Sequence, residues 1–451
     1  MFHKVLIANR GEIAVRIIRA CRELGLRTVA VCSEADRAAL HAQIADETVC
    51  IGPAPSKDSY LNIPAILSAC ELTGARAVHP GFGFLSENPG FARQCQRCGI
   101  TFIGPSPEAI EGMGNKARAK QTMAEAGVPV IPGSDGPVAT VEEAQTLAKQ
   151  IGFPLLVKAS AGGGGRGIRL VEKPAQLEDA VTQARQEAES YFGDPSVYLE
   201  KLLSNPRHVE VQILADGQGN IIHLGERDCS LQRRNQKVLE ECPSPSSLMT
   251  PKLREEMGRA AVRAARAVDY RGAGTVEFLL DAQGSFYFME MNTRIQVEHP
   301  ITEMVTGVDL VKWQLLIAMG KELTMRQEDV RFFGHAIECR INAESPEHGF
   351  RPSPGTLRAL LVPGGPGIRV DGAVYAGYTI PPHYDSMMAK LIAFAPTRQE
   401  AIAKMRWALA EFVVDGVDTN IDFQLGILRK PEFETGEYHI GTLSRWMSRQ
   451  D

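Results

Sequence analysis

The N-terminal part of the chain alternates short apolar runs with longer segments of helical periodicity. Residues 4–8 form the first apolar run, and residues 11–25 follow with apolar side chains at helical spacing from Ile13 to Leu24, ending at Gly25. Later segments continue this alternation, with predicted strands at 28–32, 48–51, 75–79 and 100–103 and predicted helices at 62–73 and 90–98. The pattern predicts a parallel, doubly wound α/β unit.

The first turn of this unit argues against a nicotinamide dehydrogenase. Residues 9–12 read Asn-Arg-Gly-Glu and contain a single glycine. A pyrophosphate approaches the backbone closely only where several glycines stand at G-x-G-x-x-G spacing. The alternation of strands and helices is therefore Rossmann-like without the corresponding dinucleotide site.

A compact unit follows the Pro-rich linker at 128–133 and contains a glycine loop at 161–167. Four successive glycines let backbone amides surround an anion, because no Cβ stands in the way. A flexible hairpin turn is the alternative, but Lys158 and Arg166 favour phosphate binding, and no Walker motif follows. The predicted elements of the unit are helices 140–152 and 175–192 and strands 154–158, 168–172 and 197–202.

Residues beyond 204 predict a mainly antiparallel region, with strands at 208–214, 221–227, 274–280 and 286–291 and a helix at 252–268. The polar run 232–237 fits an exposed turn as well as it fits a binding segment. Glu277 can face Glu290 across the second hairpin. Two carboxylates directly opposite repel unless a cation lies between them, which indicates a Mg²⁺ site.

The segment from Glu290 to Pro300 carries the densest chemistry of the chain. Glu290, Asn292, Arg294 and Glu298 stand at even spacing, so an extended chain would place them on one face. Carboxylate and amide oxygens suit Mg²⁺, and a guanidinium suits a planar oxyanion. A solvated polar edge strand is the alternative interpretation.

Composition and charge exclude several classes of protein. The chain has 451 residues, for which roughly three domains are typical. Its net charge is −5, from 49 basic and 54 acidic residues, which does not favour nucleic acid or membrane surfaces. No apolar run approaches bilayer length, and the N-terminus does not have the pattern of a signal peptide. Nine scattered cysteines indicate reduced thiols, so we expect a cytoplasmic protein.

Five separated motifs resemble biotin carboxylase, a family of the ATP-grasp superfamily. They lie at 8–14, 79–88, 205–210, 294–300 and 384–387, in the family's order and over essentially the whole chain. The resemblance implies a mixed α/β ATP-grasp fold with a mobile glycine-loop lid. The implied domains are a Rossmann-like pre-ATP-grasp domain at 1–113, an ATP-grasp domain at 114–330 with a lid at about 131–203, and a C-terminal biotin carboxylase domain at 331–451.

The resemblance also assigns roles to individual residues. For ATP it implies Lys116, Lys158, Gly164, Gly165, Glu200, Lys201, Leu203, His208, Gln232, Asn235, Glu277, Leu279 and Glu290. For Mg²⁺ or Mn²⁺ it implies Glu277, Glu290 and Asn292, and for bicarbonate Lys237, Arg294, Gln296, Val297 and Glu298. For biotin it implies Phe82, Gly83 and Arg340, and the implied catalytic set is Glu298 as general base with Arg294, Arg340 and Lys237. Asn235 and Phe82 depart from the histidine and tyrosine common in the family.

The implied reaction is ATP-dependent carboxylation of biotin with bicarbonate through carboxyphosphate. No carrier-type biotinylation turn and no carboxyltransferase region is found in the sequence. We therefore expect a stand-alone subunit that forms a homodimer and serves a separate biotin carboxyl carrier protein and carboxyltransferase, as in acetyl-CoA carboxylase of fatty acid synthesis. Two alternatives remain: another ATP-grasp ligase, such as a purine-intermediate carboxylase or a carbamoyl phosphate synthetase half, and a nucleotide-binding regulatory module without catalysis.

Overall fold

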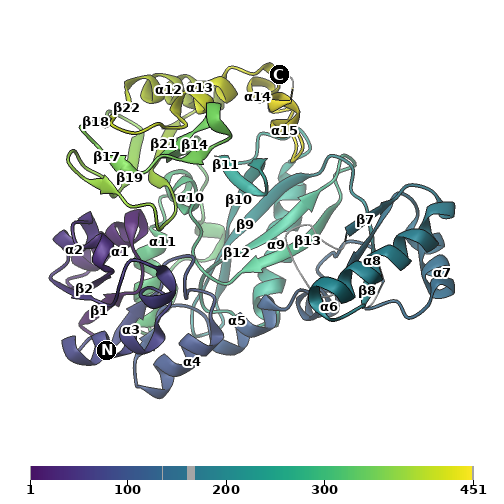
Figure 1. Cartoon of the computed structure of the whole chain (residues 1–451), viewed down its shortest axis with the longest axis horizontal. Helices are drawn as coiled ribbons and strands as arrows, with labels where there is room; N and C mark the ends of the chain where they lie inside the picture. Colours follow the sequence, from purple (N-terminus) through teal and green to yellow (C-terminus); the bar gives the residue numbers. More distant parts are fainter. Residues whose placement is uncertain (1, 135, 160–167, 449–451) are drawn as a thin grey trace.

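The computed structural model of the chain describes residues 2–134, 136–159 and 168–448 (Figure 1). Its N-terminal part is a parallel five-stranded sheet of order β3-β2-β1-β4-β5, which confirms the predicted doubly wound unit. The strands are β1 (Lys4–Ile7), β2 (Arg27–Cys32), β3 (Glu47–Cys50), β4 (Ala77–His79) and β5 (Thr101–Phe102). The helices are α1 (Gly11–Glu23), α2 (Leu40–Ile44), α3 (Ile63–Thr73), α4 (Pro89–Arg97) and α5 (Pro107–Gly114).

Local sequence signals explain where these helices begin and end. The side chains of Asn62 and Asn88 accept hydrogen bonds from backbone amides in the first turns of α3 and α4, at 3.1 and 2.8 Å. A proline in each first turn removes an amide that would otherwise lack a partner. Gly74 ends α3 with a φ of 70°, a left-handed conformation that glycine adopts at little cost.

The centre of the molecule is an eight-stranded sheet of order β13-β12-β9-β10-β11-β14-β21-β19, in which every neighbouring pair is antiparallel. The two predicted hairpins form the first four strands of this order. Strands from beyond residue 330 continue the same sheet after β11. Its strands are β9 (Arg207–Ala215), β10 (Ile221–Arg233), β11 (Gln236–Cys242), β12 (Gly272–Leu280), β13 (Phe286–Asn292), β14 (His335–Asn342), β19 (Ile368–Gly372) and β21 (Met387–Ala395).

Helices pack against both ends of this sheet. Helix α9 (Pro251–Ala267) buries Met257, Ala261 and Ala264 against β9 and β10. The remaining helices of the body are α6 (Lys116–Glu125), α10 (His299–Thr306), α11 (Leu310–Ala318), α12 (Arg398–Glu411), α13 (Ile421–Leu428), α14 (Pro431–Thr435) and α15 (Thr442–Met447). Two-stranded ribbons join β15 (Glu344–Ser345) to β16 (Arg351–Pro352), β17 (Gly355–Thr356) to β20 (Thr379–Ile380), and β18 (Ala359–Leu361) to β22 (Val413–Asp415). In the part of the chain that the structure describes, no helix combines the length and apolar character needed to cross a bilayer.

A small unit with its own core projects from this body at the right of Figure 1. It is a three-stranded antiparallel sheet of order β7-β6-β8, covered by α7 (Val141–Ile151) and α8 (Leu177–Phe192). Its strands are β6 (Leu155–Ala159), β7 (Ile168–Val171) and β8 (Val197–Lys201), close to the predicted bounds. The glycine loop, with Gly164 and Gly165, lies outside the described residues.

The polar run at 232–237 forms the turn between β10 and β11. Arg234 and Asn235 are exposed and adopt positive φ values of 50° and 63°, which suits a tight hairpin. Gln232 and Lys237 pair at the base of the turn and lie inward of it. The tip of the run is therefore an exposed turn, and the residues at its two ends face inward.

One buried carboxylate ties the C-terminal helices to the central sheet. Glu241 on β11 accepts hydrogen bonds from Arg398 at 2.8 and 2.9 Å, His335 at 2.8 Å and Tyr438 at 2.7 Å. Burial alone would raise the pKa of Glu241, but His335 and Arg398 lower the pKa to about 2. Ionised Glu241 therefore stabilises the fold at neutral pH.

This carboxylate leads to a first prediction on acid stability. Because the folded pKa lies below the ordinary value, the stabilisation, roughly 3 kcal/mol, is present above pH 4.5 and lost as the pH falls towards 2. We expect Glu241→Gln to lower the urea denaturation midpoint at pH 7 and to lower it much less at pH 3. Equal losses at both pH values would contradict this assignment.

Candidate active site

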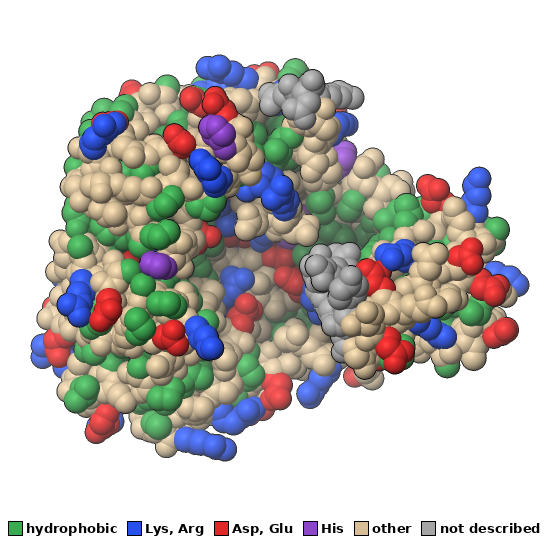
Figure 2. Space-filling model, in the orientation of Figure 1, with side chains coloured by type: hydrophobic (Ala, Val, Ile, Leu, Met, Phe, Trp, Pro, Cys, Tyr) green, Lys and Arg blue, Asp and Glu red, His purple; other side chains and the backbone are tan. Residues whose placement is uncertain are grey.

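A cavity of about 1040 Å³ opens between the N-terminal unit, the central sheet and the C-terminal strands. Figure 2 shows this hollow near the middle of the molecule, with acidic and basic side chains on its floor. It collects most of the residues predicted from the sequence. The predicted residues that line it are Phe82, Gly83, Lys116, His208, Gln232, Asn235, Lys237, Glu277, Leu279, Glu290, Asn292, Arg294, Gln296, Val297, Glu298 and Arg340.

Four other predicted residues lie on the small projecting unit or just after it and do not line this cavity. Lys158 on β6 forms an ion pair with Glu200 on β8, and Lys120 lies 3.5 Å from the same carboxylate. Lys201 ends β8 and is exposed, and Leu203 follows in the connection to β9. The predicted ATP residues therefore divide between the cavity and the unit that projects beside it.

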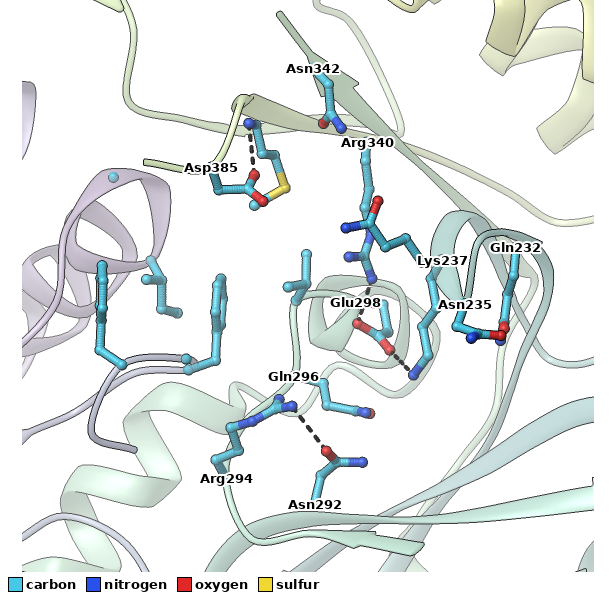
Figure 3. A pocket seen from close by; sticks show the side chains of 18 of the residues that line it. Gln232, Asn235, Lys237, Asn292, Arg294, Gln296, Glu298, Arg340, Asn342 and Asp385 are labelled. Carbon is cyan, nitrogen blue, oxygen red and sulfur yellow. Dashed lines mark hydrogen bonds and ion pairs between the residues drawn. The ribbon is translucent and has the colours of Figure 1, made fainter. Parts of the chain in front are cut away.

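Glu298 is the buried acid at the centre of the cavity, as Figure 3 shows. It stands immediately before α10, and its carboxylate oxygens accept from Lys237 Nζ at 2.6 Å and Arg340 Nη2 at 3.0 Å. Burial alone would raise the pKa of Glu298, but these two cations outweigh burial and hold the pKa below its usual value. Glu298 is thus ionised at neutral pH.

Lys237 is held by three carboxylates at once. Its Nζ lies 2.6 Å from Glu210, 2.9 Å from Glu277 and 2.6 Å from Glu298. Burial opposes the charge of Lys237, but the three acids raise its pKa well above the usual value. The result is a fixed positive charge at the floor of the cavity, suited to an anionic ligand.

The predicted carboxylate pair is in register across β12 and β13, where Glu277 stands opposite Glu290. Lys237 and His208 balance the charge of Glu277, and His208 Nε2 lies 3.1 Å from it. Burial is the main cause that raises the pKa of Glu290, and the charge of Glu277 adds to it. A divalent cation would relieve that repulsion, so Glu277, Glu290 and the amide oxygen of Asn292 fit a Mg²⁺ ion.

The prediction that residues 290–298 form one extended strand is wrong. Strand β13 ends at Asn292, and residues 293–298 form a loop that leads into α10. The turn still brings Arg294 into the cavity, where its Nη2 donates to Asn292 at 2.9 Å (Figure 3). Even spacing identified the right residues, but loop geometry and not strand alternation brings them together.

Three contributors to the site were missed by sequence reasoning. Glu87, in the motif at 79–88, accepts from Arg294 Nε at 2.9 Å, far away in the chain. Glu240 on β11 accepts from Arg340 Nε at 2.7 Å. Arg227 on β10 is fully buried beneath the floor of the cavity. The contacts of Glu87 and Glu240 join segments that lie far apart in the chain, so spacing within one motif does not reveal them. Arg227 stands opposite Glu210 in the predicted hairpin of β9 and β10, but nothing in the sequence indicated that it is buried there.

Arg227 uses every nitrogen of its guanidinium. It donates to Glu210 at 2.6 Å, Gln212 at 2.7 Å and Gln296 at 2.8 Å, and also to the hydroxyls of Thr275 and Thr302. Glu210 and Gln296 in turn contact Lys237 and Glu277. The buried guanidinium therefore fixes the floor on which the charged residues stand.

The N-terminal unit contributes the remaining wall through two motifs that contact each other. The amide of Asn9 donates to the carbonyls of Pro80 and Phe82 at 2.6 and 2.7 Å. This contact holds Phe82 and Gly83 at the edge of the cavity. The motif at 8–14 thus positions the loop at 79–88.

The fold and the charged cavity define an ATP-grasp enzyme. Three family models cover the chain: biotin carboxylase, N-terminal domain, at 1–110; carbamoyl-phosphate synthase L chain, ATP binding domain, at 115–326; and biotin carboxylase C-terminal domain, at 338–445. Among curated relatives, biotin carboxylase 1 of Bacillus subtilis is 59% identical over 447 residues, covering 99% of both chains. The chain belongs to the biotin carboxylase family.

Other relatives and solved structures agree over the full length. The biotin carboxylase of Pseudomonas aeruginosa is 56% identical over 446 residues, 99% of this chain and 98% of that one. The biotin carboxylase domain of Hydrogenobacter thermophilus 2-oxoglutarate carboxylase, solved with MgADP, ADP and bicarbonate, has a TM-score of 0.90 and 52% identity, covering 100% and 99%. A biotin carboxylase from Campylobacter jejuni has a TM-score of 0.91 and 49% identity, covering 99% of each chain.

Proposed function

We propose that this cavity carries out the first half-reaction of a biotin-dependent carboxylase and that the residues predicted above carry it. The chain is an ATP-dependent biotin carboxylase, a ligase that forms carboxybiotin, ADP and phosphate from biotin, bicarbonate and ATP. The observation that supports the assignment of roles is the ionised Glu298, held between Lys237 and Arg340 in one cavity. The three-part division at 1–113, 114–330 and 331–451 remains part of this proposal.

ATP is proposed to lie between the projecting unit and the central sheet. Lys116, Lys158 and the amides of Gly164 and Gly165 would approach the phosphates, and Glu200, Lys201 and Leu203 would border the adenine. His208, Gln232, Asn235 and Leu279 would complete the nucleotide site. Glu277, Glu290 and Asn292 would hold Mg²⁺, which when bound neutralises phosphate charge.

Glu298 is proposed as the general base towards bicarbonate. Lys237, Arg294, Gln296 and the backbone of Val297 would hold the anion beside it. Binding an anion to Lys237 draws that cation away from Glu298, so the pKa of Glu298 rises towards the range useful for proton removal. The deprotonated oxygen then attacks the γ-phosphorus, the bond to the β-phosphate oxygen breaks and ADP leaves. Closure of the site protects the resulting carboxyphosphate from water.

Arg340 is proposed to hold the ureido oxygen of biotin, with Phe82 and Gly83 beside it. Carboxyphosphate splits into CO₂ and phosphate, and the phosphate takes the N1′ proton of biotin. Negative charge then develops on the ureido oxygen, where a fixed guanidinium stabilises it, and N1′ attacks the carbon of CO₂ to form carboxybiotin. Glu240 fixes Arg340 from behind, so the cation does not need to reorganise during the step.

Removing Arg340 is therefore expected to separate the two partial reactions. Arg340→Ala should lower biotin carboxylation roughly 10²-fold, because one preorganised oxyanion donor is lost. Bicarbonate-dependent ATP hydrolysis without biotin should fall much less. Both rates come from one coupled assay with and without free biotin, and Arg340→Lys serves as the charge-preserving control. Equal losses in both rates would reject the biotin role.

The partners of the chain are also part of the proposal. A biotin carboxyl carrier protein would present biotin, and a carboxyltransferase would use the product, most simply in a cytoplasmic acetyl-CoA carboxylase of fatty acid synthesis. A homodimer is proposed because the related Hydrogenobacter domain is described as a dimer. A biotin carboxylase subunit of pyruvate carboxylase is equally similar, at 52% identity and a TM-score of 0.90. Capture of the biotinylated partner from the native host identifies which acceptor the complex serves.

The direct test uses purified chain with ATP, Mg²⁺, labelled bicarbonate and free biotin. We expect label in carboxybiotin, with ADP release that depends on bicarbonate and magnesium and is stimulated by biotin. Chelation of magnesium should stop both. ADP release without label in biotin would overturn the proposed reaction.

A further inference from the structure

Two buried glutamates lie behind Arg340, and beyond the contact by which Glu240 fixes Arg340 they have no assigned role. Glu240 on β11 and Glu338 on β14 stand opposite each other in register, and both are 0% exposed. Opposite residues of an antiparallel pair leave the sheet on the same face, with Cβ atoms roughly 4.5–5.5 Å apart. Two carboxyl groups are thus packed side by side in the interior, next to the guanidinium of Arg340.

Most of the carboxyl oxygens of this pair have no hydrogen-bond donor among the described residues. One oxygen of Glu240 accepts from Arg340 Nε at 2.7 Å, and Arg340 Nη2 lies 2.6 Å from it. The other oxygen of Glu240 and both oxygens of Glu338 have no hydrogen-bond partner among the described residues. Ionised carboxylates can only accept, so two of them cannot satisfy each other. A single proton shared by the pair would supply one donor between the two groups.

Burial favours that proton even though cations lie near the pair. The neighbours are Arg340 on the same strand as Glu338, Lys390 on β21, Lys237 on β11, and Glu298 before α10. Lys390 is occupied elsewhere, since it donates to the carbonyl of Val297 at 2.8 Å and lies 3.1 Å from Glu12. Burial is the largest cause that raises the pKa of Glu338 well above its usual value, and it raises the pKa of Glu240 to about 7.

We propose that Glu240 and Glu338 share one proton at neutral pH and act together as positioning residues for Arg340. This inference rests on the proposed role of Arg340 in holding biotin. With one proton, the pair carries one negative charge, which anchors Arg340 through Glu240. A second charge would surround the guanidinium with three carboxylates, counting Glu298, and would weaken its attraction for the oxyanion of biotin. The shared proton therefore lets Glu240 hold Arg340 in place while the guanidinium stays free to attract the oxyanion of biotin.

Infrared spectroscopy of the whole protein tests the proton directly. At neutral pH, protein labelled at glutamate carboxyl carbons should show a protonated-carboxyl stretching band that Glu338→Gln removes. The same change at Glu411, an exposed glutamate on α12, should leave that band unaltered. A spectrum in which Glu338→Gln removes no protonated-carboxyl signal would overturn the shared proton. This result does not depend on any enzymatic activity.

The positioning role is tested by the pH dependence of KM for biotin. In the wild type, KM should rise at alkaline pH as the shared proton is lost, whereas Glu338→Gln, which cannot lose a proton, should keep a flat alkaline profile. Glu240→Gln should raise KM roughly tenfold at every pH, because Arg340 loses a charged hydrogen-bond partner. Superimposable profiles of wild type and Glu338→Gln would reject the role. If the wild type itself does not carboxylate biotin, the proposed function is rejected, and the infrared result still stands.

Discussion

Glu298→Gln is expected to abolish bicarbonate-dependent ATP hydrolysis while leaving ATP binding intact. Glutamine occupies the same volume but cannot take a proton, and general bases contribute roughly 10²–10⁴-fold to such rates. The variant should fold, because Lys237 keeps Glu210 and Glu277 as partners and Arg340 keeps Glu240. Steady-state ADP release and nucleotide binding by calorimetry measure the two effects separately.

A second buried glutamate outside the cavity shows whether the loss is specific to Glu298 or follows from changing any buried glutamate. Glu226 on β10 is equally buried and forms a two-bond ion pair with Arg254, at 2.8 Å for each bond, but it does not line the cavity. Glu226→Gln should therefore retain bicarbonate-dependent hydrolysis. If Glu298→Gln retains it as well, the base lies elsewhere. If Glu298→Gln loses ATP binding too, the residue acts in assembly of the site.

Most of the architecture could be predicted because its signals are local. Alternation of apolar runs with helical periodicity predicted the parallel N-terminal sheet, and the strands predicted at 208–214 and 221–227 form the hairpin of β9 and β10. Short helices such as α6 and α10 were missed. Residues 116–125 are mostly polar with a weak apolar stripe, and α10 has only 8 residues that are buried on nearly all sides, so neither segment gives a long periodic pattern.

The site could be predicted only in part, because its side chains come from separate elements. The register that sets Glu277 opposite Glu290 follows from one hairpin and was predicted correctly. The contact between Arg294 and Glu87 joins the loop after β13 to the N-terminal unit, and no spacing within one motif encodes it. The buried pair Glu240 and Glu338 depends on the register of β11 against β14, which the sequence pattern leaves open.

Arg227→Met is expected to cause the largest loss of stability. Removing one partner of a buried ion pair costs about 3–5 kcal/mol, because the remaining charge stays buried without compensation. Here Glu210 would keep Lys237, but Gln212, Gln296 and two threonine hydroxyls would lose a donor in the interior. The urea denaturation midpoint should therefore fall sharply.

The exposed ion pair of Arg358 with Asp415 provides the control for this measurement. Arg358→Met removes the same kind of charge from the surface, where ion pairs contribute little, so the midpoint should hardly change. At temperatures where Arg227→Met remains folded, KM for bicarbonate should also rise, because Gln296 loses the donor that orients its amide beside the proposed anion site. A variant with wild-type stability would show that the interior repacks around the methionine, and the floor of the cavity would then not depend on this guanidinium.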